Sequence, residues 1–543
     1  MILRIIIISF LSGMLWANNS YPGSFLLHKT MDDTLSVQNE LKSNVITEIR
    51  LQGDSTVWLG TGQGLSVLRD SVSVIAMDTL TLVGGSEVVL NDGIAAIAVF
   101  GEKLFCAGAT DDGDTPVGAG FYMTDAALDE HVVWSYYPQP VDEVGDSLVP
   151  YAGRIFRALP VTTDHANVTY DATFTDDYIW TTSWAGGLRR LDLSSGSEWD
   201  RVPLPKDSQR FLITCADSAY TDDGTGNEIL NNFYLNPRDP RDSGNHNHKA
   251  FSVVGYGDTI WVGTANGINR GILGSGGCVD WEHYSFPEDG LSGNFVVSVA
   301  YQNWQGERTI WAATLNAEDP GEERGLSYSV DDNVWSIVPE LQGERVYNVH
   351  TSGSYVFAGA ESGLWISPDV GKTWAKYPPA IDTTYLATDE ILSQSVFAVN
   401  IDTRDYYGRP VLWMGTLDGL GRSSDLNAGN WTIYRTDYLG VYAYPNPFSP
   451  NIHHVMGEDG YVRFHTGDVA SYVIEMAVYN FAMERVYRLS FDRRHANAGA
   501  LKWNGRDMNG RQVDNGVYFV NLNYSESANQ SPGDHWLKLI IVK

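Results

Sequence analysis

The chain has 543 residues, of which 43% are hydrophobic, 12% are aromatic and only 19% are charged. It carries 36 Lys and Arg against 67 Asp and Glu, a net charge of −31, so we exclude nucleic acid and anionic lipid as partners. Abundant aromatic side chains and 54 Gly at this length indicate more than one domain of short strands and tight turns.

The first residues have the pattern of a secretory signal peptide. Arg4 precedes an apolar run from Ile5 to Trp16, and Ala17 then leads into polar residues. The run is too short for a stable membrane anchor, and we expect no membrane-spanning segment elsewhere. The sequence therefore predicts a signal peptide over 1–17 and a mature protein that is secreted or lies on the outer surface of a Gram-negative-type bacterium.

One short pattern of an apolar residue, an aromatic residue and a Gly or small residue recurs seven times. Its copies are Val57–Thr61, Leu104–Gly108, Ile179–Thr182, Ile260–Thr264, Ile310–Thr314, Val356–Gly359 and Leu412–Thr416. A Gly followed by a hydrophobic residue comes after each copy, and in six cases a Trp follows in turn. Four short strands repeated seven times predict an all-β fold, a seven-bladed β-propeller over residues 18–440.

This repeat resembles that of the two-component-regulator propellers, which read as a strand, W-x-G-T and a G-L turn. The segment from Ser367 to Trp374 also resembles the Asp-box of sialidases and sortilin-type propellers. The resemblance implies the fold and leaves the function open, because propellers carry many unrelated activities. Asp-boxes lie away from the active face, so we expect Asp369 to stabilise a turn.

The chain contains three cysteines, Cys106, Cys215 and Cys278. An odd number cannot form a complete disulfide framework. We therefore expect Cys106 and Cys215 to be buried strand residues.

The sequence pattern changes after Trp431. A Pro-rich segment, Tyr444 to Pro450, precedes alternating apolar strands and two Gly-bearing turns, which predicts a small Ig-like β-sandwich over 441–543. This region resembles the C-terminal sorting domain of type IX secretion and the flagellar hook-assembly Ig-like module. The residues that carry the resemblance are Pro445, Asn446, Pro447, Trp503, Gly505, Gly516 and Lys543. It implies the secretion machinery as a partner; the alternative is a purely structural cap.

Four long connections interrupt the repeat, at 109–119, 138–168, 205–249 and 315–324. The order of antiparallel strands predicts that all four extend one face, which we expect to bind a ligand. Aromatic rings stack on sugars and anchor protein interfaces. The candidate ligand-binding residues are Tyr136, Tyr137, Trp184, Tyr234, Asp222 and Glu322.

The acidic, Gly-bearing loop from Thr221 to Glu228 is the best candidate for calcium, which binds several oxygen ligands. Its candidate ligands are Asp222, Asp223 and Glu228, although a solvated acidic loop explains the same residues. His246 and His248 alternate in a nearby loop, but no carboxylate stands at ligand spacing from them.

No nucleophile, phosphate-loop or zinc-protease motif occurs, and we assign no catalytic residue. The sequence favours a binding protein that recognises an extracellular polymer or protein. Two alternatives stay open. One is a polysaccharide-active enzyme, a glycoside hydrolase or lyase, on the propeller scaffold; the other is a periplasmic sensor propeller.

Overall fold

The computed structural model describes residues 41–69, 74–112, 115–145, 147–194, 196, 198–237, 245–316, 320–332, 334–378, 380–382, 389–424, 426, 431–436, 441–466, 472–495, 499–525 and 531–543. The predicted signal peptide lies outside this part. The described residues form strands and short 3-10 helices, which confirms the expected all-β class. None of the helices within these ranges has the length and apolar character needed to cross a membrane.

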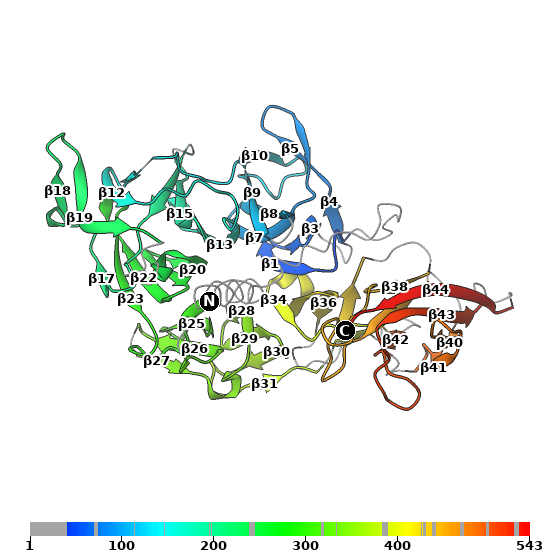
Figure 1. The fold of residues 1–543 in the computed structure, drawn as a ribbon. Coiled ribbons are helices and arrows are strands. Elements are labelled where there is room, and N and C mark those ends of the chain that lie inside the picture. Colours follow the sequence, from blue (N-terminus) through cyan, green and yellow to red (C-terminus); the bar gives the residue numbers. More distant parts are fainter. Residues whose placement is uncertain are drawn as a thin grey trace, which may run out of the picture.

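Seven antiparallel sheets, each with four strands in chain order, follow one another from residue 46 to residue 434 (Figure 1). The first three contain β1 (Ile46–Gln52), β2 (Thr56–Thr61), β3 (Gly64–Leu68) and β4 (Ile75–Met77); β7 (Gly93–Phe100), β8 (Lys103–Asp112), β9 (Thr115–Thr124) and β10 (Val133–Tyr137); and β13 (Thr169–Phe174), β14 (Tyr178–Ser183), β15 (Gly187–Asp192) and β16 (Trp199–Val202). The fourth and fifth contain β20 (Ala250–Tyr256), β21 (Thr259–Thr264), β22 (Gly267–Leu273) and β23 (Val279–Tyr284); and β24 (Phe295–Trp304), β25 (Glu307–Leu315), β26 (Gly325–Val330) and β27 (Trp335–Ile337). The last two contain β28 (Val346–Ser352), β29 (Tyr355–Ala360), β30 (Gly363–Ser367) and β31 (Ala375–Lys376); and β34 (Val396–Asp402), β35 (Val411–Thr416), β36 (Gly419–Ser423) and β37 (Trp431–Tyr434).

The seven sheets form a closed, propeller-like ring (Figure 1). The first strand of each sheet contacts the first strand of the next, and β34 of the last sheet contacts β1 of the first. The first strands therefore surround a common axis. A few additional strands widen the sheets, namely β5 (Thr79–Leu82) and β6 (Glu87–Val89) in the second sheet and β17 (Phe211–Leu212) in the fourth.

The recurring sequence pattern lies in the second strand of every sheet. Its Trp side chains are buried: Trp58, Trp180, Trp261, Trp311 and Trp413 are at most 1% exposed. In most sheets, the Gly that opens the third strand adopts a positive φ, a backbone conformation that residues with a Cβ atom rarely adopt. At Gly267, for example, φ is +99°, and an added Cβ would collide with the carbonyl oxygen of Tyr284.

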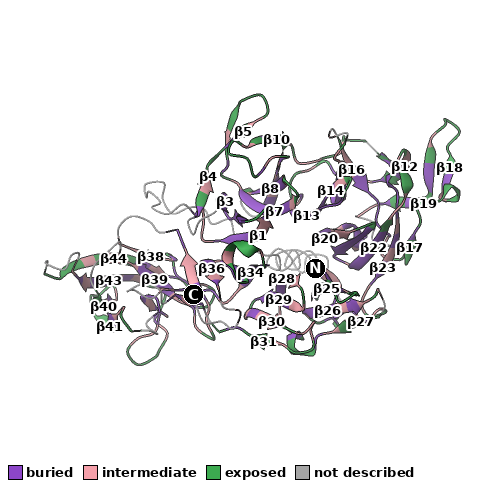
Figure 2. Cartoon of the chain, turned by 180° about the vertical axis from the view of Figure 1, so that it is seen from behind, coloured by how far each residue is buried: buried purple, intermediate pink, exposed green. Residues whose placement is uncertain are grey.

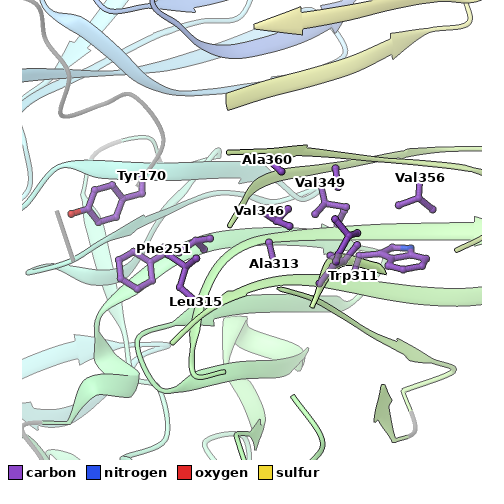
Figure 3. Packing of buried hydrophobic residues seen from close by; sticks show 14 of the residues in the cluster. Tyr170, Phe251, Trp311, Ala313, Leu315, Val346, Val349, Val356 and Ala360 are labelled. Carbon is purple, nitrogen blue, oxygen red and sulfur yellow. The ribbon is translucent and has the colours of Figure 1, made fainter. Parts of the chain in front are cut away.

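Every first strand has a register shift against its second strand at the same place, which is the signature of a β-bulge. The residues at the shift are Thr47, Ala95, Tyr170, Phe251, Val297, Tyr347 and Phe397, and all are buried. Tyr170 and Phe251 project into a buried cluster with residues of later sheets (Figure 3). The bulges bring side chains of all seven first strands to the same level near the axis.

Residues after 441 form a second unit with a core of its own. Its sheets are β38 (Tyr442–Tyr444), β39 (Val462–His465) and β42 (Lys502–Trp503), and β41 (Arg485–Asp492), β40 (Val473–Tyr479), β43 (Gly516–Tyr524) and β44 (Gly533–Ile541). The buried residues of this core all come from positions 443–541. Figure 2 shows buried stretches in both the ring and this unit, which we call the C-terminal unit.

The long connections add a further sheet at the outside of the ring, which we call the rim sheet. It consists of β11 (Leu148–Tyr151), β12 (Arg154–Ala158), β19 (Glu228–Leu235) and β18 (Tyr220–Asp222), in this order (Figure 1). The remaining elements are β32 (Ile381–Asp382), β33 (Asp389–Glu390) and the 3-10 helices η1 (Asp217–Ala219), η3 (His246–His248), η4 (Ser275–Gly277), η5 (Pro339–Leu341) and η6 (Asp405–Tyr407).

Candidate functional site

The rim sheet joins two connections that are distant in sequence. Strand β12 of the first pairs in parallel with β19 of the second, and Arg157 lies opposite Tyr234. Beneath it, Phe156 and Phe233 lie in one buried cluster with Trp180 and other residues of the third and fourth ring sheets. The rim sheet is thus packed onto the ring rather than suspended from it.

A disulfide between Cys215 and Cys278 fastens the second connection. The expectation that Cys215 is a buried strand residue is wrong: it is half-buried, lies outside the strands and is bonded to Cys278. The sequence count gives no pairing, because the partners are 63 residues apart and belong to different elements. The expectation is confirmed for Cys106, which is buried in β8 and has a free thiol.

The disulfide also shows where the second connection runs. Cys278 lies in the turn between β22 and β23, the third and fourth strands of its sheet. In an antiparallel sheet this turn is at the opposite end from the turn between the second and third strands. The connection 205–249 therefore passes along the outer edge, where β17 pairs with β23, instead of extending a single face as expected.

Arginines brace this region. Arg190 is 1% exposed, stacks on Tyr178 at 4.4 Å and on Tyr151 and Trp180 at 5.3 Å, and donates a hydrogen bond to the Gly277 carbonyl oxygen. Arg154 of β12 forms ion pairs with Asp217 of the 3-10 helix η1 and with Glu228 of β19, the latter at 2.9 Å. These contacts order the rim sheet against the ring.

The structure separates the predicted aromatic contact residues. Tyr136 on β10 and Tyr234 on β19 are 46% and 44% exposed, so both rings are open to a partner. Tyr137 is half-buried beside Trp199, with ring centroids 6.3 Å apart. Trp184 is also half-buried and packs against the bulge-level residue Phe251 at 5.6 Å.

The two predicted carboxylates also differ in environment. Glu322 is 8% exposed and accepts a hydrogen bond from Asn294 at 3.1 Å, which favours a structural contact over ligand binding. Asp222 lies exposed on β18, so it shares the rim sheet with Tyr234. Of the six candidates, Tyr136, Tyr234 and Asp222 are therefore the accessible ones.

The acidic loop uses its carboxylates to fold. The Asp222 carboxylate accepts a hydrogen bond from the amide of Gly224 at 2.7 Å. The Asp223 carboxylate accepts hydrogen bonds from the amide and the hydroxyl of Thr225, at 2.8 and 2.6 Å. Glu228 pairs with Arg154. Across the described residues, no group of three or more His, Cys, Asp or Glu is placed to hold a metal ion. Calcium binding at this loop stays a prediction.

A cavity of about 320 Å³ lies along the ring axis and was not anticipated from the sequence. It is lined by first strands, and its charged or titratable lining residues include Glu48, Arg50, Asp171 and His350. Arg50 lies between the two acids, with Nη1 2.8 Å from Glu48 and Nη2 3.8 Å from Asp171. The available sequence signal is the acidic residue that follows the bulge in β1 and β13, where the other first strands have Ala, Ser or Asn.

The acids of the cavity have perturbed ionisation. Burial raises the pKa of Glu48 to about 7, against the attraction of Arg50. Burial also raises the pKa of Asp171, although this carboxylate accepts hydrogen bonds from the Ser252 hydroxyl at 2.8 Å and from the Val253 amide at 2.9 Å. Burial lowers the pKa of His350 to about 4, so its imidazole is neutral at pH 7.

In the C-terminal unit, residues of the predicted sorting motif come together. The Asn446 side chain donates to the Lys538 carbonyl at 2.8 Å and accepts the Ile540 amide at 3.0 Å, so the Pro445–Pro447 segment is attached to the final strand. Gly505 has φ +72°, and an added Cβ would press on Phe448 and Pro450. Of the remaining motif residues, Trp503 is buried in β42, Gly516 opens β43, and Lys543 follows β44, where its amide donates to Asn515.

The C-terminal unit joins the ring through buried charges. Asp418, which is fully buried, accepts a hydrogen bond from Arg463 of β39 at 2.6 Å and pairs with Arg435 at 3.3 Å. Glu390 pairs with Lys502 of β42 at 2.6 Å. Burial opposes ionisation of Asp418, but the two guanidinium groups hold its pKa well below the usual range. Such a network holds two units in one orientation.

No protein-family model matches the chain, and no curated protein matches it. Among solved structures, it is similar to PorZ, a bacterial surface component of the type-IX secretion system of Porphyromonas gingivalis, at 13% identity and a TM-score of 0.32. That match covers 92% of this chain, which spans 66% of the PorZ chain.

Two other structures illustrate the range of these similarities. YCF48 from Cyanidioschyzon merolae is 12% identical with a TM-score of 0.37, covering 71% of this chain and 97% of that chain. The extracellular domain of the hybrid two-component system BT4673 from B. thetaiotaomicron is 11% identical with a TM-score of 0.29, covering 92% and 68%. Similarities at this level carry no functional argument, so the function is argued from the geometry.

Proposed function

We propose that this chain is a secreted or cell-surface recognition protein. Its ring is a seven-bladed β-propeller that, together with the rim sheet, presents a binding surface to an extracellular polymer or protein. Residues 441–543 act as an Ig-like domain for sorting or anchoring. The observation that carries the proposal is the rim sheet, a braced surface that the closure of the ring does not require.

The construction of the rim sheet supports this role. Ordering its residues costs conformational entropy, which the buried cluster around Phe156 and Phe233 offsets. On its outside, Tyr234 and Leu148 are 44% and 42% exposed, a mixture of aromatic and aliphatic surface that suits an interface. The Cys215–Cys278 disulfide favours an oxidising, extracytoplasmic compartment.

Affinity electrophoresis in gels containing xylan, β-glucan or glycol chitosan tests the binding surface. We expect at least one polymer to retard the full chain. The double variant Tyr136→Ala/Tyr234→Ala should bind at least about fivefold more weakly, because stacking rings contribute on the order of 1 kcal/mol each. Tyr406→Ala is the matched control, since Tyr406 is also 46% exposed but lies in η6.

The same samples distinguish binding from catalysis. We expect no release of reducing ends from any of the three polymers. If reducing ends are released by the natural chain but not by Asp222→Asn, the protein cleaves glycans, and the proposed binding role is wrong. If the double variant and Tyr406→Ala lose retardation equally, the exposed tyrosines do not form the binding surface. If no gel retards the full chain, these polymers are not its partners.

The export role is supported by the way the motif is held. Asn446 attaches the Pro-rich segment to β44, and Lys543 is held at the end of the same strand by Asn515. The final strand and the opening segment therefore form one ordered surface. A sorting receptor that reads the chain's last residues would find them in a fixed arrangement.

A further inference from the structure

Acidic side chains lie at one level of a cavity whose lining mixes polar and apolar residues. Val297, Val299, Ala95 and Ala98 line it together with Glu48, Arg50 and Asp171. Buried carboxylates are costly unless they are paired or bind a cation. Their presence on the axis, where Ala occupies the equivalent place in β7 and β34, therefore calls for a compensating role.

The charges in the cavity do not balance. Among the described residues of the lining, Glu48 and Asp171 are acids and Arg50 is the one permanently charged base, while His350 is neutral at pH 7. Hydrogen bonds from Ser252 and Val253 hold Asp171 in place, and Arg50 is fixed by its bond to the Ile97 carbonyl at 3.0 Å. Once Glu48 and Asp171 are both ionised, two negative charges face one positive charge in a fixed arrangement.

A second observation, independent of the acids, points to a ligand. Asn400 lines the cavity and is 5% exposed, and its amide nitrogen donates to the Ile49 carbonyl at 3.1 Å. Its Oδ1 is buried, and within the described part of the chain it has no hydrogen-bond partner. A buried acceptor without a donor costs roughly as much as a lost hydrogen bond. A ligand N–H group would remove this cost.

We propose that the axial cavity binds a small hydroxylated solute through a protonated primary amine, with Glu48 and the Asn400 carbonyl oxygen as its acceptors. An ammonium group supplies one positive charge and three donors. Glu48, which shares the guanidinium group of Arg50 with Asp171, and the Asn400 amide oxygen would accept these donors. A volume of about 320 Å³ is at the small end of ligand sites and suits a molecule of monosaccharide size.

A bare metal ion is a poorer fit to the same residues. Divalent cations need several oxygen ligands around one point, and Arg50 occupies the space between the two acids. The cavity is also separate from the rim sheet and its exposed tyrosines. Binding at the axis and binding at the rim can thus succeed or fail independently.

Isothermal titration calorimetry of the full chain at pH 8 with 1-amino-1-deoxyglucitol tests the proposal. The matched neutral probe is glucitol, which has the same skeleton with a hydroxyl in place of the amine. We expect the amine to bind at least about tenfold more tightly than glucitol. Glu48→Gln should weaken amine binding about tenfold, whereas Glu307→Gln, the same change at an exposed site, should leave it within about twofold.

A variant that adds charge guards against misfolding as an explanation. His350→Glu places a further carboxylate on the lining and should strengthen amine binding severalfold, a gain that misfolding cannot produce. The proposal is overturned if the amine and glucitol bind equally, if neither binds at millimolar concentration, or if Glu48→Gln and Glu307→Gln behave alike.

Discussion

At the scale of single residues, the position that follows the bulge is occupied by residues of different chemical character in different first strands. The residue after the bulge is Glu48 in β1 and Asp171 in β13, but Ala96 in β7 and Ala398 in β34. The backbone places all of them near the axis. The side chains then determine that β1 and β13, the strands on either side of β7, contribute buried acids and the others contribute small or neutral groups.

The raised pKa of Glu48 predicts a specific effect of pH on stability. Between its ordinary value of 4.5 and about 7, the native state holds a proton that the unfolded chain releases, so this group's stabilising contribution falls as pH rises through that window. Glu48→Gln removes the effect. Relative to the natural chain, the variant should therefore gain up to about 3 kcal/mol in unfolding free energy between pH 5 and pH 8.

Urea unfolding at both pH values measures this difference, with Glu307→Gln as the control that should show no pH-dependent gain. An equal effect of Glu48→Gln at pH 5 and pH 8 would mean that Glu48 has an ordinary pKa in the native state.

At the scale of strands and sheets, the sequence predicts the repeated elements well because their chemistry is local. The pattern around Trp58 or Trp261 reports a buried second strand, and the Gly that follows reports the turn. The Asp369 turn was also predictable: its carboxylate accepts the amide and hydroxyl of Thr373 at 2.8 and 2.7 Å.

The rim sheet and the axial cavity were not predictable in the same way. Ile155 and Ile229, which pair across the rim sheet, are separated by a complete ring sheet in the sequence. Glu48 and Asp171 both lie beside Arg50 because β1, β7 and β13 stand side by side around the axis and each bulge falls at one level. Hydrophobic periodicity reports which face of a strand is buried, but it does not report which distant residues share that face.

Reduction of the disulfide is the element-scale test of the rim sheet. In the double variant Cys215→Ser/Cys278→Ser we expect a loss of about 2–4 kcal/mol in unfolding free energy, because the bond closes a loop between residues 63 apart. Thermal melting with and without reductant measures the loss. Reductant should not affect the double variant, and an unchanged melting temperature of the reduced natural chain would contradict a bracing role.

At the scale of the whole molecule, the ring and the C-terminal unit meet through buried ion pairs. Asp418 lies in the ring's last sheet region between Arg435 and Arg463, and Lys502 pairs with Glu390. Each of these pairs is buried to a large extent. Separating the units would therefore leave Arg463 and Lys502 without the carboxylates they contact in the ring. The junction therefore fixes the orientation of the C-terminal unit.

Asp418→Asn tests the junction. The change removes one of the two carboxylates that pair with the buried guanidinium groups of Arg435 and Arg463 and leaves Asp389 as the other. We therefore expect a loss of about 3 kcal/mol, at the low end for a broken buried ion pair. In scanning calorimetry the C-terminal unit should then unfold at a lower temperature than the ring. Asp54→Asn, at an exposed turn, should leave the profile unchanged, and an Asp418→Asn profile identical to that of the natural chain would show that the network does not hold the units together.

The central claim, an exported recognition protein routed by its C-terminal unit, is tested most directly by the location of the chain in a bacterium with type IX secretion. Protease is added to intact cells that produce either the full chain or a chain lacking residues 444–543, and surface digestion is measured. The account predicts that the full chain is digested, whereas the shortened chain is folded, protected and recovered from the periplasm. Equal digestion of both chains would contradict it.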